Sequence, residues 1–164
     1  MSETFLGRYR ILEPPDEDDI LAMLRRLVHG EQPTVIVHGR KYAAWKTTAT
    51  FPDLASVPRI DSSLEKLARF HASVDQAASG VREGAKLGAG RRERYAFTRR
   101  NLLSVVRFLR LEISRCDRKD ATGAMRGALD RYYIKRVTAE DREVVLRLLD
   151  AAGIGMKTWA LGAA

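Results

Sequence analysis

The chain has 164 residues, the length of one ordinary domain, and 45% of them are hydrophobic and 30% charged, which excludes a disordered tail. With 12 glycines and 5 prolines it is not a collagen-like or low-complexity chain. The formal net charge is +8, and the single cysteine, Cys116, excludes a disulfide within the chain and favours a reducing compartment.

The first elements expected are a short strand and an amphipathic helix. Phe5 to Leu12 alternates weakly between apolar and polar residues, which favours a strand that the two following prolines would end. The acidic run Asp16 to Asp19 suits the positive first turn of a helix, and apolar residues then recur at helical spacing. The pattern predicts a helix from about Asp16 to His29, just before Gly30.

A β-hairpin is expected next. Thr34 to His38 is rich in β-branched residues, and Tyr42 to Phe51 places small and aromatic residues, Trp45 among them, on one face. Two strands alone are marginally stable, so Phe5 to Leu12 is a candidate for a third strand. We also expect the preceding helix to cover one face of this sheet.

A capping motif marks the next helix. Ser62-Ser63-Leu64-Glu65 has the spacing of a capping box, in which the Ser and Glu side chains satisfy amides of the first turn. It predicts a helix that ends near Gly80, followed by a flexible glycine-rich connection. The apolar face of this helix is expected to consist of Leu64, Leu67, His71, Val74 and Ala78.

The remainder of the chain is expected to be helical. Arg91 to Cys116 contains neither Pro nor Gly, which permits one long helix with a core stripe and an arginine stripe side by side. A further helix is expected from Ala121 to about Arg136. Thr138 is a second cap signal and opens a last helix that ends at Gly153. In the tail that follows, Trp159 is either packed on the core or offered to a partner.

Together these elements predict an α+β fold that is mainly α, with a small N-terminal helix and antiparallel hairpin followed by a basic helical bundle. The expected parts are a helix and hairpin region with the second helix (1–79), a glycine-rich loop (80–90) and a basic helical region (91–164), within one compact domain. The first twelve residues lack the apolar core of a signal peptide, and no segment has the roughly 18 to 20 apolar residues of a membrane span. We therefore expect a soluble, cytoplasmic protein that does not bind membranes.

The excess positive charge belongs to one segment. Residues 91–136 carry 14 Lys or Arg and 5 Asp or Glu, a net charge of +9, whereas 1–60 and 61–90 are each neutral and 137–164 carries −1. Most of these cations are arginine, whose planar fork suits phosphate oxygens. Aromatic rings are interspersed among them, and such rings can stack on bases. The segment therefore predicts a polyanion-binding surface.

We expect a non-catalytic nucleic-acid-binding protein, for DNA or RNA, that uses an arginine-rich helical face on the phosphate backbone. Tyr133 is a further candidate for stacking on bases, although it and the two tyrosines named next are also ordinary residues of a core boundary. The residues expected to contact the nucleic acid are Arg91, Arg92, Arg94, Tyr95, Arg99, Arg100, Arg107, Arg110, Arg118, Tyr132, Lys135 and Arg136. The alternative is a protein-interaction adaptor or regulatory subunit that binds an acidic partner. Either interpretation is compatible with a homo-oligomer.

The sequence carries no motif typical of a catalytic, metal or cofactor site. The three histidines and Cys116 lie on different expected elements, without the spacing of a metal site. The glycines from Gly84 to Gly90 lack the Gly-Lys-Ser/Thr ending of a P-loop. We therefore expect no metal and no cofactor. An enzyme is the less favoured interpretation, in the form of an unrecognised nuclease.

Overall fold

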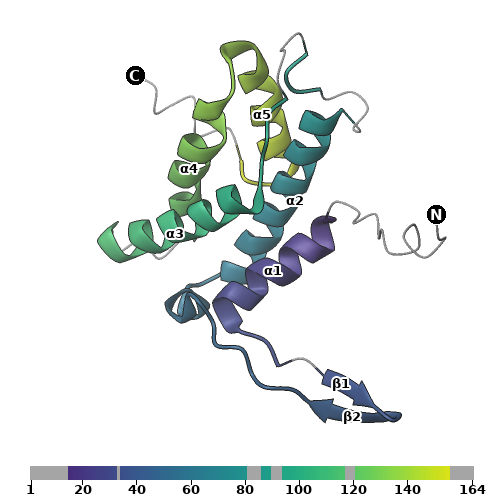
Figure 1. Ribbon diagram of the computed structural model, residues 1–164. Coiled ribbons are helices and arrows are strands. Elements are labelled where there is room, and N and C mark those ends of the chain that lie inside the picture. The colour runs from purple at the N-terminus through teal and green to yellow at the C-terminus, as the bar shows by residue number, and fades with distance from the viewer. Residues whose placement is uncertain (1–14, 33, 81–85, 90–93, 117–120, 156–164) are drawn as a thin grey trace, which may run out of the picture.

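The computed structural model describes residues 15–32, 34–80, 86–89, 94–116 and 121–155 (Figure 1). These ranges hold mainly α-helix together with one two-stranded antiparallel hairpin, which confirms the predicted α+β, mainly α class. In chain order the elements are α1 (Glu17–His29), β1 (Thr34–Val37), β2 (Arg40–Ala43), the 3-10 helix η2 (Pro52–Ser56), α2 (Ile60–Ser79), α3 (Arg99–Cys116), α4 (Ala121–Tyr132), the 3-10 helix η3 (Ile134–Arg136) and α5 (Ala139–Ala151).

Helix α1 forms as its sequence predicts. The side chain of Asp16 caps it by accepting a hydrogen bond of 2.8 Å from the backbone amide of Asp19. The helix ends at Gly30, whose φ of 72° places it in a conformation that favours glycine. Its buried residues are Ile20, Leu24 and Val28, and they face α2.

The hairpin is shorter and more exposed than the sequence predicts. Its strands pair from Thr34 with Ala43 to Val37 with Arg40, and the turn between them has positive φ at both His38 and Gly39, as in a type I′ turn. Every residue of both strands is exposed, so the expected cover by α1 is wrong. The candidate third strand, 5–12, lies outside the described residues.

The second strand ends early because the chain after it is held against α1. Glu31 and Thr47 form an isolated antiparallel bridge, with the Thr47 amide donating to the Glu31 carbonyl over 2.7 Å. The amide of Phe51 then donates to the carbonyl of Leu27 over 2.8 Å, and the ring of Phe51 is buried. The predicted strand therefore does not continue to Phe51, because the chain there turns to bury the Phe51 ring.

The capping box predicted at Ser62 is wrong, because α2 begins two residues earlier. Arg59 occupies the N-cap position in the left-handed conformation and makes no side-chain cap. This start brings Ile60 into the helix as a buried residue. The carboxylate of Glu65 pairs with Arg25 of α1 instead of with the start of its own helix. The predicted apolar face of α2 and its end at Gly80 are confirmed.

The single long helix predicted over 91–116 is wrong as well, because α3 begins at Arg99 and residues 94–98 are not helical. The ring of Phe97 is buried and stacks on Tyr133, with centroids 5.3 Å apart and planes at 4°. In the first turn of α3, the side chain of Asn101 accepts a hydrogen bond of 3.0 Å from the amide of Thr98, the residue just before the helix. Aromatic burial thus outweighs the helical preference of this segment.

Helix α2 lies at the centre of the core. It contacts α1 on one side and α4 and α5 on another, while α3 packs mainly on α4 (Figure 1). The predicted last helix is confirmed, with the Thr138 hydroxyl as its cap, whereas the preceding helix tightens into η3 after Tyr132. In the described part of the glycine-rich loop, 86–89, Leu87 is buried and its amide donates to the Ala77 carbonyl. The tail with Trp159 lies outside the described residues.

Candidate nucleic-acid interface

Helix α3 separates an apolar side from a cationic side. Leu102, Val105, Val106 and Leu109 are fully buried. At 3.6 residues per turn, four arginines fall within an arc of about 100° beside this apolar side. All four are exposed: Arg99, Arg100, Arg107 and Arg110, which we call the α3 arginine face. The predicted division of this helix into two stripes is confirmed for the part that is helical.

Three members of the α3 arginine face have no acidic partner in the described ranges, and the fourth has one. Arg110 pairs with Asp53 of η2, with 2.6 Å between Nε and Oδ2, and its guanidinium lies 5.9 Å from the centre of the Phe51 ring. No ion pair within those ranges involves Arg99, Arg100 or Arg107. These three guanidinium groups are therefore available to an external anion.

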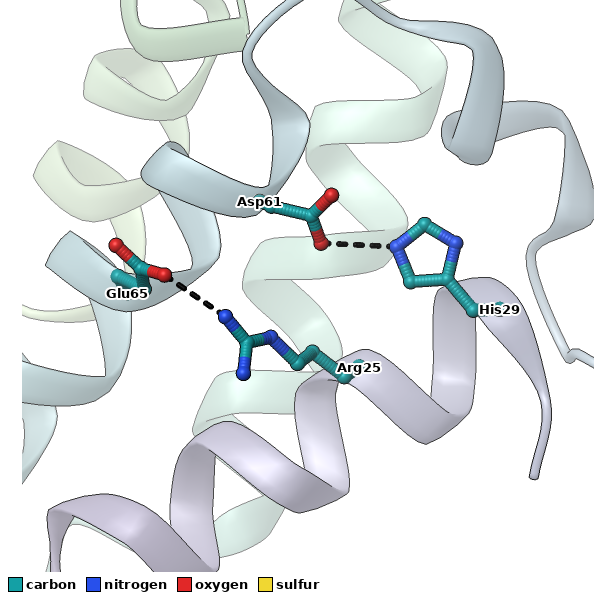
Figure 2. Close-up of polar contacts among 4 residues, drawn as sticks. All are labelled: Arg25, His29, Asp61 and Glu65. Atoms are coloured by element: carbon teal, nitrogen blue, oxygen red, sulfur yellow. Dashed lines mark hydrogen bonds and ion pairs between the residues drawn. The ribbon is translucent and has the colours of Figure 1, made fainter. Parts of the chain in front are cut away.

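The cations of α1 are arranged differently. Arg25 of α1 pairs with Glu65 of α2 over 2.8 Å, and the imidazole of His29 lies 2.9 Å from the carboxylate of Asp61 (Figure 2). Arg26 pairs with Glu31 in the same region. These contacts join α1 to α2 and to the start of the hairpin, so the basic residues of α1 are engaged within the protein.

A shallow hollow of about 280 Å³ lies where α1 approaches the start of α3. Asp19, Arg26 and Arg99 line it together with apolar side chains. Its mixed charge, with an acid beside two arginines, does not favour a particular ligand. It does show that Arg99 projects toward α1 and not toward the core.

The other predicted cations are dispersed. Arg94 is exposed ahead of α3, and Arg136 is exposed in η3. Lys135 pairs with Asp130 over 2.7 Å. The remaining predicted positions, Arg91, Arg92 and Arg118, lie outside the described residues.

The tyrosines named as stacking candidates are engaged in the fold to different degrees. Tyr95 donates from its hydroxyl to Asp141 over 2.8 Å and accepts from the amide of Thr138 over 3.0 Å, which ties the segment before α3 to the start of α5. Tyr132 is partly buried, edge-on to Phe108. Tyr133 is fully buried and belongs to the core. Tyr95 and Tyr132 are each partly buried, so part of each ring is open to a ligand, whereas that of Tyr133 is not.

Tyr133 also holds the one buried histidine of the described chain. Its hydroxyl lies 2.7 Å from Nδ1 of His71, and both residues sit among apolar side chains. Burial lowers the pKa of His71 to about 4, so the imidazole is neutral at neutral pH. Burial also raises the pKa of Tyr133. The pair acts as a neutral polar contact within the core, between α2 and the end of α4.

Sequence reasoning missed the exposure of the hairpin and the short segment after it. Trp45 is 95% exposed and Tyr42 is 51% exposed, although the preceding helix was expected to cover one face of the sheet. Arg40, Lys41 and Lys46 are exposed beside them. The signal was present in the sequence, because residues 34–50 contain these three cations and no acid.

Within the described part of the chain, no helix combines the length and apolar character that crossing a bilayer requires. The same residues hold no group of three His, Cys, Asp or Glu side chains that could share a metal ion. Comparison with protein-family models, curated proteins and solved structures finds no significant match to the chain.

Proposed function

We propose that this protein is a non-catalytic nucleic-acid-binding protein and that the α3 arginine face contacts the phosphate backbone. The observation that carries the proposal is the contrast between helices: the arginines of α1 pair with acids of the protein, whereas Arg99, Arg100 and Arg107 are exposed and unpaired within the described ranges. Both DNA and RNA fit this chemistry.

The spacing along the helix supports a phosphate track. Arg99 and Arg107 are eight residues apart, which is about 12 Å along the axis at 1.5 Å per residue. Successive phosphates of one B-DNA strand rise by about 3.4 Å along the axis, so two cations about 12 Å apart can engage separate phosphates along a backbone. Each phosphate that is neutralised releases counterions, which makes affinity fall steeply with salt.

The proposal is tested by removing charge from α3 and, as a control, the same charge from α5. The double variant Arg99→Gln/Arg107→Gln is compared with Arg142→Gln/Arg147→Gln, which removes two exposed cations of α5. Binding to fluorescent single-stranded and duplex DNA and RNA is measured by anisotropy across a salt series. We expect the α3 variant to weaken binding and to reduce the log-log salt slope by about 1 for each arginine lost.

Two results would contradict the proposal. The first is undetectable binding by the unaltered protein at micromolar concentration in low salt, which would favour an acidic protein partner for the same face. The second is an equal loss of affinity in the α3 and α5 variants, which would show that net charge alone governs binding.

A further inference from the structure

The hairpin forms an exposed arm, which we define as residues 34–46. Figure 1 shows β1 and β2 extending away from the helices, joined to the body at one end only. The arm holds five of the six large hydrophobic residues that are exposed in the described chain: Val35, Ile36, Val37, Tyr42 and Trp45. A two-stranded hairpin with no cover gains little stability from such residues, so their exposure points to a ligand.

The charge of the arm indicates the class of that ligand. Arg40, Lys41 and Lys46 are exposed, and no acidic residue occurs between positions 34 and 50. Residues two apart in a strand share a face, so Tyr42 and Arg40 lie side by side on one face of β2. An apolar protein partner would have to desolvate these cations without compensation, whereas a polyanion would neutralise them. The arm therefore complements a polyanion with apolar faces, which is the character of a nucleic-acid strand.

The chain that follows the arm contacts one member of the α3 arginine face. The Glu31–Thr47 bridge closes the arm against the end of α1, and the chain continues to the buried ring of Phe51. Arg110, a member of the α3 arginine face, packs over that ring and pairs with Asp53 just beyond it. These contacts connect the α3 arginine face, through Arg110, to the segment that leads from the arm.

We infer that the arm binds unpaired bases, with Trp45 and Tyr42 as stacking platforms and Arg40, Lys41 and Lys46 on the neighbouring phosphates. This inference rests on the proposed function and adds a substrate class to it, namely single-stranded nucleic acid. Aromatic side chains stack on bases whose faces are open, and a duplex hides those faces. The α3 arginine face would contact the phosphate backbone of single strands and duplexes alike, so the arm supplies the preference for single strands.

The test separates ring stacking from general contact with the arm. Trp45→Leu and Tyr42→Leu keep apolar bulk but remove a ring, and their exposure means that neither change disturbs the core. Ile36→Thr is the matched control, since it removes exposed apolar surface from the same arm without touching a ring. Affinity for a single-stranded oligonucleotide and for its duplex is measured by anisotropy. Trp45 fluorescence is followed in a Trp159→Phe background, because the chain has two tryptophans.

We expect Trp45→Leu to weaken single-strand binding by about 5- to 150-fold per stacked base while duplex binding changes little. Ile36→Thr should bind as the unaltered protein does, and the single strand should quench Trp45. The inference would be overturned if both ring variants bind the single strand as the unaltered protein does. If Arg99→Gln/Arg107→Gln is still defective in that case, the proposed function stands. Absence of any nucleic-acid binding would overturn both.

Sedimentation distinguishes a second copy of the chain as the occupant. The inference is wrong if three results occur together: the unaltered protein is a dimer, the Trp45→Leu variant is a monomer, and both bind the single strand with the same affinity. The arm would then serve self-association. A monomer in both cases, with the affinity loss described above, supports it.

Discussion

Lowering the pH should destabilise the fold through one buried side chain, His71. Its pKa is about 4 in the folded protein and 6.5 as a free side chain. Between these values the unfolded chain takes up a proton that the folded protein does not, so stability is fully present above pH 6.5 and is lost as the pH falls toward 4. The two values differ by about 2.5, and each pH unit corresponds to about 1.4 kcal/mol, so the expected loss is about 3 kcal/mol.

Urea unfolding followed by circular dichroism between pH 7 and pH 4.5 measures this loss. Carboxylates also titrate in this range, and burial raises the pKa of the Asp75 carboxyl, which acts in the opposite direction. The quantity of interest is therefore the difference between the unaltered protein and His71→Gln, which keeps a polar side chain that can reach Tyr133. We expect this difference to shrink as the pH falls. A difference that stays constant from pH 7 to pH 4.5 would refute the reasoning, and so would an NMR titration of His71 with a midpoint near 6.5.

Two further predictions concern backbone geometry and helix capping. Gly30→Ala should lower the free energy of unfolding by about 2 kcal/mol or more. The added Cβ would lie 2.4 Å from the Thr47 carbonyl oxygen, and the residue has a φ of 72°, which disfavours a side chain. A melting temperature equal to that of the unaltered protein would contradict the described path of the chain at the base of the arm. Thr138→Ala should cost about 1 kcal/mol in chemical denaturation, because it removes the cap on Asp141 and leaves the amide without its hydroxyl acceptor. Thr138→Ser is the matched control and should restore most of that loss.

The elements that could be predicted are those specified by residues close in sequence. The cap bond of Asp16 lies within the first turn of α1, and that of Thr138 lies within the first turn of α5, so each helix start is marked by residues three apart. The periodicity of α2 identified its buried face, because a helix with one covered side repeats every 3.6 residues. The same periodicity separated the arginines of α3 from its core residues.

The elements that were mispredicted depend on partners far apart in the chain. The start of α3 is set by Phe97 stacking on Tyr133, and no local pattern reveals a partner at that distance. The pairing of Arg110 with Asp53, 57 residues apart, is equally invisible in the sequence. The exposure of Trp45 was missed because alternation shows that two faces differ without showing that either is covered.

The central position of α2 has a consequence for how the protein opens. The helix has 20 residues and is about 30 Å long, and it buries side chains against α1 at one region and against α4 and α5 at another. Neither group of helices can detach without exposing part of the same helix to water. The amides in the middle of α2 should therefore exchange hydrogen with solvent only through global unfolding, whereas those of the arm should exchange through local opening. The slowest exchange rates in the molecule would then report its overall stability directly.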